Sequence, residues 1–166
     1  MKKNLYPIPK RYTDPSKLVL CDPRAKGFLG DWDGRSGAAL FGPTKAGKSL
    51  AAGLGCLRVN KRENSESWCK WVRADYLTCL VGQKTQSAWE QISELQAARV
   101  LVIDEMGYEP WPTSVLMFIG DRHDTERPTI ITCGLEVSAF SQRYADATLR
   151  RILEIGNGCL VDFWKK

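Results

Sequence analysis

The sequence predicts an α/β domain built on a mostly parallel sheet. Short apolar segments with the character of buried strands alternate along the chain with helix-like segments. A glycine-rich loop directly follows the first strand-like segment, and two carboxylates close a later one. The length of 166 residues suits one domain of ordinary size.

Five segments have the character of strands, and helices are expected between them. The strands are expected at 36–41, 68–74, 99–105, 128–133 and 159–163. The helices are expected at 48–59, 75–81, 87–98, 113–124 and 137–155, with a polar connection at 60–67. The sequence RVLVIDE at 99–105 is a continuous apolar run before its two carboxylates, as expected of a strand buried on both faces.

Proline is concentrated at the start of the chain. Four of the eight prolines stand at positions 7, 9, 15 and 23. Because proline interrupts regular structure, we expect an extended arm that lies over the body of the protein. We therefore divide the chain into an extended arm at 1–35 and a domain at 36–166.

Charge and composition narrow the classes of partner. The formal net charge of +5 leans mildly toward an anionic partner such as nucleic acid. The longest aliphatic run, Val100 to Ile103, is far shorter than the ~20 residues of a membrane span. The start MKKNLYPIPK has no apolar stretch behind it, so it is not a secretory signal. We expect a cytoplasmic protein without a membrane partner.

The cysteines do not have the spacing of a metal site. None of the six forms a C-x-x-C pair, and His123 is the one histidine of the sequence. A zinc site of the usual spacing is therefore not expected. We expect these cysteines to be buried small apolar residues in a reducing compartment. They stand at positions 21, 56, 69, 79, 133 and 159.

The glycine-rich loop has the pattern G-x-x-x-x-G-K-[ST]. Its residues are Gly42, Pro43, Thr44, Lys45, Ala46, Gly47, Lys48 and Ser49. Glycine permits the dihedral angles that turn backbone N–H groups inward around a polyphosphate, and the helix that follows directs its positive end at the phosphates. Lys48 is expected to reach the β- and γ-phosphates and Ser49 to ligate Mg²⁺. The alternative is a glycine turn with a surface lysine.

Two carboxylates close the apolar run at 99–105. A strand packed beside the loop strand would bring Asp104 to the Mg²⁺ held by Ser49, directly or through water. Glu105 would then polarise an attacking water. The alternative is a solvated strand end. With the phosphate loop, this pair predicts a site for ATP or ADP with Mg²⁺.

Several segments together resemble one protein family. These are PIPKRYTDPS, LFGPTKAGKS, VLVIDEMG, IGDRHDTERPTIITCGL and RYADATLRRILEIGNG. In this order they resemble the lead-in, Walker A, Walker B, sensor 1 and arginine-finger segments of the DnaC/IstB-like AAA+ ATPases. That branch comprises helicase loaders and the ATPase helpers of certain transposons. The resemblance implies a P-loop NTPase of the AAA+ type, a three-layer sandwich with a five-stranded parallel sheet in the order 5-1-4-3-2.

The resemblance also implies that a neighbouring subunit completes the site. Arg151 stands where the family has an arginine that stabilises charge on the γ-phosphate of the neighbour. Arg150 is the second candidate for this role, and the alternative for both is a solvated helix charge. Arg122 matches an arginine before the sensor 1 strand that could also face a neighbour. Self-association through a trans arginine is therefore expected.

The sequence departs from the family pattern at several places. Thr132, Cys133 and Gly134 stand where the family has Thr-Ser-Asn, so the asparagine amide that would orient water is missing. Either Thr132 substitutes for it or hydrolysis is slow. Lys45 replaces a common glycine and adds positive charge near the nucleotide. The chain as given has no room for a helical lid or for the N-terminal domain with which such loaders grip a helicase.

Three functions remain to be weighed. The first is an ATPase that resembles helicase loaders or transposon helpers and assembles on single-stranded DNA with a replicative helicase or another replication or transposition protein. The second is a nucleotide-bound adaptor or decoy that does not hydrolyse ATP, which the missing asparagine favours. A small-molecule kinase fits poorly, because no arginine-rich lid segment is evident. Candidate DNA phosphate contacts are Lys2, Lys3, Lys10, Arg11, Lys61, Arg62 and Lys84, and most of the six tryptophans are expected in the core.

Overall fold

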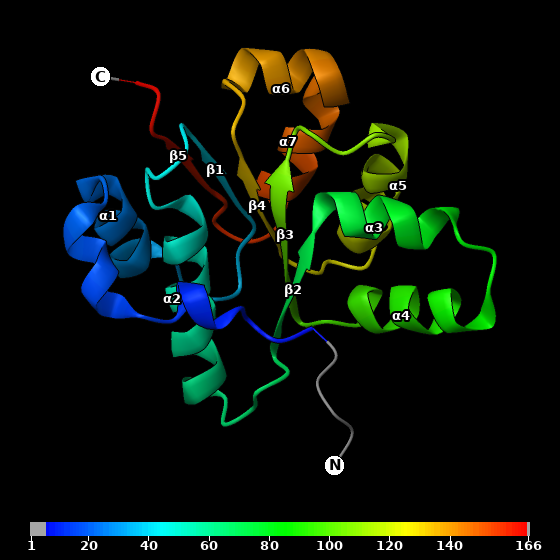
Figure 1. Cartoon of the computed structure of the whole chain (residues 1–166), viewed down its shortest axis with the longest axis horizontal. Helices are drawn as coiled ribbons and strands as arrows, with labels where there is room; N and C mark the ends of the chain where they lie inside the picture. The colour runs from blue at the N-terminus through cyan, green and yellow to red at the C-terminus, as the bar shows by residue number, and fades with distance from the viewer. Residues whose placement is uncertain (1–5, 166) are drawn as a thin grey trace.

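The computed structural model describes residues 6–165, which form one five-stranded sheet with helices on both faces (Figure 1). The strands are β1 Ala38–Phe41, β2 Cys69–Arg73, β3 Val100–Met106, β4 Thr129–Cys133 and β5 Cys159–Asp162. All neighbouring pairs are parallel. The order is β2-β3-β4-β1-β5, which confirms the predicted order 5-1-4-3-2.

The helices between the strands agree with the expected alternation. They are α1 Pro23–Asp31, α2 Lys48–Arg62, α3 Ala74–Gly82, α4 Gln86–Gln96, α5 Pro112–Asp124, α6 Val137–Tyr144 and α7 Asp146–Glu154. Two short 3-10 helices, η1 Lys10–Tyr12 and η2 Pro15–Leu20, precede α1. Helices α1 and α2 cover one face of the sheet, and α3 to α7 lie on the other side (Figure 1).

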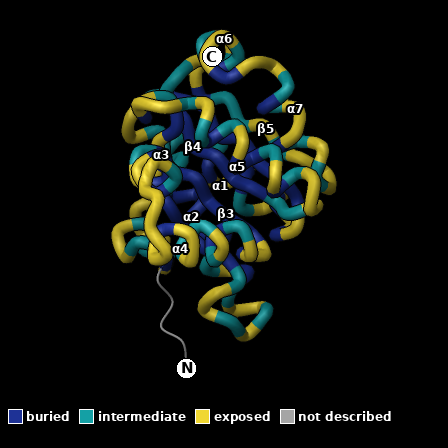
Figure 2. Tube along the Cα trace, turned by 90° about the vertical axis from the view of Figure 1, so that its right-hand side faces the viewer, coloured by how far each residue is buried: buried dark blue, intermediate teal, exposed yellow. Residues whose placement is uncertain are grey.

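The central strands are buried on both faces, as the continuous apolar runs predict. In β3, Leu101 and Ile103 pack into the core on the α3–α7 side, and Val100 and Val102 pack into the core under α1 and α2. Figure 2 shows β3 and β4 in the buried centre of the molecule. Burial of alternate side chains in two separate cores fixes the sheet as the middle of three layers.

The expectation of an extended arm at 1–35 is wrong for η1, η2 and α1. The prolines that suggested interruption instead begin helices, because Pro15 and Pro23 occupy first-turn positions where a missing N–H is harmless. Asp14 and Asp22 cap these helices by accepting hydrogen bonds from the backbone N–H groups two residues later. Residues 1–5 lie outside the described part of the chain, and the division after residue 35 stays a prediction.

The expected helix at 137–155 is also interrupted. It is divided into α6 and α7 at Ala145, which has a φ of 63°. The break gives the two helices different directions (Figure 1). Phe140 and Tyr144 of α6 are buried in the core, and so is Ile152 of α7. Alanine favours helices, so its sequence carried no signal for a break, and tertiary packing overrides the local preference.

Two expectations about the core were too broad. Cys56, Cys69 and Cys133 are buried as predicted, but Cys79 is exposed. Of the tryptophans, Trp32 and Trp71 are buried, whereas Trp89, Trp111 and Trp164 are exposed. In the described residues, no helix has both the length and the apolar character needed to cross a membrane.

Candidate nucleotide-binding site

The glycine-rich loop joins the end of β1 to the start of α2. Gly47 has a φ of 101°, in the left-handed region that favours glycine. A Cβ at this position would lie 2.7 Å from the Cβ of Cys21, so the loop also packs closely against the segment before α1. Asp22 donates its backbone N–H to the carbonyl of Ala46. The conformation of the loop therefore depends on contacts with Cys21 and Asp22 as well as on its own glycines.

Lys48 folds back over the loop. Its Nζ donates to the carbonyl oxygens of Gly42 at 2.7 Å and Pro43 at 2.8 Å. Burial lowers the pKa of the Lys48 amine, while the nearby Cys133, Asp104 and Glu105 act in the opposite direction. A desolvated ammonium close to the first turn of α2 is a strong partner for phosphate.

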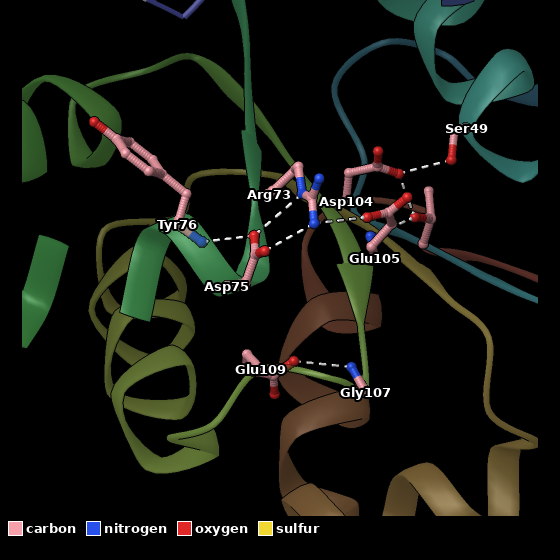
Figure 3. A network of polar contacts seen from close by, with 9 residues as sticks. Ser49, Arg73, Asp75, Tyr76, Asp104, Glu105, Gly107 and Glu109 are labelled. Atoms are coloured by element: carbon pink, nitrogen blue, oxygen red, sulfur yellow. Dashed lines mark hydrogen bonds and ion pairs between the residues drawn. The ribbon is translucent and has the colours of Figure 1, made fainter. Parts of the chain in front are cut away.

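Asp104 lies near the carboxyl end of β3, beside the first turn of α2. Its carboxylate is fully buried, and its Oδ1 accepts a hydrogen bond from Ser49 Oγ at 2.7 Å (Figure 3). The same oxygen accepts a hydrogen bond from Thr132 Oγ1 at 2.6 Å. Its Oδ2 is buried and has no hydrogen-bond partner among the described residues. A buried carboxylate oxygen without a partner is costly, and a hydroxyl and a carboxylate are ligands that Mg²⁺ prefers. These groups fit the metal that the sequence predicts.

Glu105 stands beside this carboxylate in a constrained backbone conformation. It has a φ of 61°, which is uncommon for a residue other than glycine. Its backbone N–H donates to Thr132 Oγ1 at 3.0 Å, so Thr132 connects both carboxylate residues. The Glu105 side chain is 47% exposed and therefore accessible to solvent.

Arg73 is a site residue that sequence reasoning missed. Its guanidinium lies 3.3 Å from Glu105 Oε2 and 2.7 Å from Asp75 Oδ2 (Figure 3). It ends β2, where the parallel register places it beside Asp104. The strand was predicted at the correct position, but an arginine at a strand end resembles any surface charge until the register is known.

A cavity of about 830 Å³ opens over these residues. One wall is formed by the loop and the ends of β3 and β4, and the other by the segment before α1. The lining residues are Arg11, Tyr12, Lys17, Leu20, Cys21, Thr44, Lys45, Gly47, Lys48, Ser49, Leu50, Arg73, Asp75, Glu105, Tyr108, Glu109, Thr132, Cys133 and Gly134. The contribution of η1 and η2 was not predicted, because Arg11 was assigned to DNA and the arm was expected to be extended.

The predicted arginines lie elsewhere. Arg122 is fully buried and donates to carbonyls of its own chain, including Leu95 at 3.0 Å and Pro128 at 2.7 Å. Burial lowers the pKa of Arg122 to about 9. The expectation that Arg122 could face a neighbour is wrong. Its guanidinium is buried and bonded to backbone carbonyls at the end of α4 and before β4. Arg150 and Arg151 are exposed on α7 and do not line the cavity.

Comparison with solved structures identifies the fold. No protein-family model matches the sequence, and no curated protein matches it. The structure of a DnaC helicase loader is similar with a TM-score of 0.68 and 14% identity, over 93% of this chain and 100% of that chain. The structure of DnaI is similar with a TM-score of 0.62 and 19% identity, over 82% of this chain and 77% of that chain. The chain has the AAA+ fold.

A third similar structure places a nucleotide analogue in this fold. It is AMPPCP-bound DnaA from Aquifex aeolicus, with a TM-score of 0.60 and 16% identity, over 94% of this chain and 51% of that chain. At these identities the likeness concerns the AAA+ fold alone.

Proposed function

We propose that this chain binds ATP with Mg²⁺ and hydrolyses it to ADP and phosphate, in an assembly that acts on DNA in replication or transposition. The observation that carries the proposal is the buried carboxylate of Asp104, which bonds to Ser49 below the phosphate loop and keeps its Oδ2 without a protein partner. A bound Mg²⁺ would satisfy that oxygen and would offset the cost of burying it.

The loop residues hold the phosphates. Backbone N–H groups at the start of α2 and the Lys48 ammonium supply positive charge, and Lys45 adds another cation to the cavity wall. Ser49 and Asp104 would hold Mg²⁺, which neutralises charge on the β- and γ-phosphates when bound. Lys48 would exchange its bonds to the carbonyls of Gly42 and Pro43 for bonds to phosphate oxygens.

Glu105 would act on water. In hydrolysis, water oxygen forms a bond to the γ-phosphorus, the bond from that phosphorus to the ADP oxygen breaks, and the water proton passes to the Glu105 carboxylate. Arg73 and the Thr132 contact to the Glu105 N–H hold this residue at the cavity wall. The accessible side chain and the φ of 61° are compatible with a residue positioned for chemistry.

The alternative proposal is an adaptor that binds ATP without turning it over. It is favoured by Gly134, which supplies no side-chain amide at the end of β4. The Thr132 hydroxyl has a single proton, and that proton is donated to Asp104. A role for Thr132 in orienting water stays a prediction. Slow hydrolysis also stays a prediction.

The proposed partners are single-stranded DNA, a replicative helicase or another replication or transposition protein, and further copies of this chain. The similarity to the structure of a DnaC helicase loader supports a helicase as partner. Lys61 and Arg62 lie in the last turn of α2 and remain candidate DNA contacts, whereas Arg11 lies at the cavity. Exposed Trp89 and Trp111 offer surfaces for base stacking.

Calorimetry and steady-state turnover test the proposal. The protein should bind ATP and ADP, with tighter binding in Mg²⁺ than in excess EDTA. Lys48→Ala should weaken binding about 10- to 100-fold, since it removes a charge-assisted contact. Lys26→Ala, an exposed lysine on α1 away from the cavity, is the matched control. Equal affinity in the Lys48 variant and the parent would refute the phosphate site, and turnover with and without single-stranded DNA separates the ATPase from the adaptor.

A further inference from the structure

The end of β4 is covered by an aromatic ring from another strand end. A Cβ built on Gly134 would lie 2.6 Å from the hydroxyl oxygen of Tyr108, 3.1 Å from its Cε2 and 3.3 Å from its Cζ. The tyrosine therefore occupies the space that a side chain at position 134 would need. Glycine at 134 and tyrosine at 108 are spatially complementary.

The backbone on both sides of Tyr108 is anchored. Gly107 has a φ of 114°, and its N–H donates to Glu109 Oε2 at 2.9 Å (Figure 3). Glu109 is buried, and its carboxylate also accepts a hydrogen bond from the Tyr144 hydroxyl. Arg143 donates to the Glu109 carbonyl. The turn after β3 is thus fixed to α6, which limits the positions that the Tyr108 ring can take.

The Tyr108 side chain is nevertheless presented to the cavity. The residue is 71% exposed and lines the same wall as Glu105, Thr132 and Gly134. Its hydroxyl has no hydrogen-bond partner in the described part of the chain. An accessible phenol that is held at one end and has a free O–H suits the binding of an anionic oxygen.

We propose that the Tyr108 hydroxyl donates a hydrogen bond to the γ-phosphate of ATP. It would take the place of the side-chain amide that Gly134 lacks. This inference rests on the proposed function. It follows from three properties: the ring lies over Gly134, the hydroxyl is free, and Lys48 and Glu105 line the same cavity. Since ADP lacks the γ-phosphate, the contact distinguishes ATP from ADP.

Tyr108→Phe removes only the hydroxyl and is the direct test. Turnover should fall at least about tenfold, because a donor to charge that develops in the transition state is lost. The preference for ATP over ADP, measured by calorimetry, should fall about fivefold, while ADP affinity stays the same. Tyr76→Phe is the matched control, since Tyr76 is a partly exposed tyrosine whose hydroxyl donates to Gln91 and which does not line this cavity.

A second pair of variants tests the complementarity of 108 and 134. Tyr108→Ala combined with Gly134→Asn clears the ring and supplies an amide at the end of β4. This double variant should recover turnover lost in Tyr108→Ala. Recovery would show that the defect of Tyr108→Ala lies in the missing donor.

The outcomes separate this inference from the proposed function. If the parent binds neither nucleotide, both fail. If the parent binds ATP and ADP but Tyr108→Phe matches it in the ATP-to-ADP preference and in any turnover, only the Tyr108 assignment is overturned. A parent without turnover still tests the assignment through the nucleotide preference.

Discussion

Ser49 and Asp104 are 55 residues apart in the sequence, and their side chains are joined by a hydrogen bond of 2.7 Å. The contact joins the first turn of α2 to the end of β3, and it therefore holds the phosphate loop close to Asp104. The same Asp104 oxygen accepts from Thr132 on β4. Three separate segments therefore meet on one carboxylate, whose other oxygen remains available to a metal.

Asp104→Asn should separate stability from metal binding. The amide carbonyl can still accept from Ser49 and Thr132, and the substitution removes a buried charge that lacks full compensation. Without ligand, the melting temperature should stay equal or rise, since an uncompensated buried charge is destabilising. The extra affinity for ATP that Mg²⁺ provides should disappear. Thermal unfolding with and without MgATP measures both effects.

A large fall in the melting temperature of the ligand-free Asp104→Asn protein would contradict this account. It would mean that the carboxylate is structural and that both oxygens are satisfied in solution. Thr132→Val is a useful comparison, because it removes one donor to Asp104 and keeps the size of the side chain. It should destabilise the protein by about 1–2 kcal/mol.

Glu105→Gln and Arg73→Ala should impair turnover and leave ATP binding intact. The amide cannot accept a proton from water, so Glu105→Gln should reduce turnover by at least about 10². Arg73→Ala should have a smaller effect, because it frees the glutamate without removing it. Phosphate release and calorimetry on the same samples measure the two properties. Weaker ATP binding in Glu105→Gln would instead place Glu105 among the binding residues.

The labelling rates of the cysteine thiols should show whether a nucleotide enters the cavity. Burial raises the pKa of Cys133 to about 11, so this thiol is protonated at pH 8 and should react slowly with iodoacetamide. Exposed Cys79 should react first. Cys21 is half-buried and lines the cavity, so its reaction in a Cys79→Ser variant should slow when MgATP is added. Mass spectrometry identifies the labelled residues. If Cys21 reacts with iodoacetamide at the same rate with and without MgATP, the nucleotide does not bind in this cavity.

Sequence reasoning reached the sheet and the phosphate loop because both depend on local signals. Continuous apolar runs identify strands buried on two faces, and G-x-x-x-x-G-K-S identifies a loop with its lysine and serine. Arg73 and Tyr108 were missed because their roles arise from register and from packing between strand ends. The break at Ala145 was missed because alanine is a strong helix former.

The arm shows a different limit. Pro15 and Pro23 favour an extended chain when they are considered alone, but each is preceded by an aspartate that caps a helix. The pair Asp-Pro was a helix-start signal that could have been recognised in the sequence. The placement of Arg11 and Leu20 at the cavity could not, because it depends on where these short helices pack.

The last prediction concerns Arg151, which should act on a nucleotide held by another copy of the chain. Arg151 lies on α7 with a guanidinium nitrogen close to Gly120 of α5, and it does not line the cavity of its own chain. An arginine brought to the γ-phosphate from a neighbour offsets charge in the transition state and contributes on the order of 10³ or more in rate. Arg151→Ala should therefore lose turnover and keep ATP affinity. Arg150→Ala tests the second candidate, and we expect a smaller effect because Arg150 pairs with Glu154 on its own helix at 3.4 Å.

Mixing Arg151→Ala with Lys48→Ala tests whether the arginine acts between subunits. Arg151→Ala keeps an intact phosphate loop, and Lys48→Ala keeps an intact Arg151. A mixed interface pairs the intact loop of one copy with the intact arginine of the other, so the mixture should recover part of the parental rate. Specific activity should also rise with protein concentration until assembly saturates. If Arg151→Ala is as active as the parent and specific activity does not depend on concentration, the site is complete within one chain and Arg151 is a solvated helix charge.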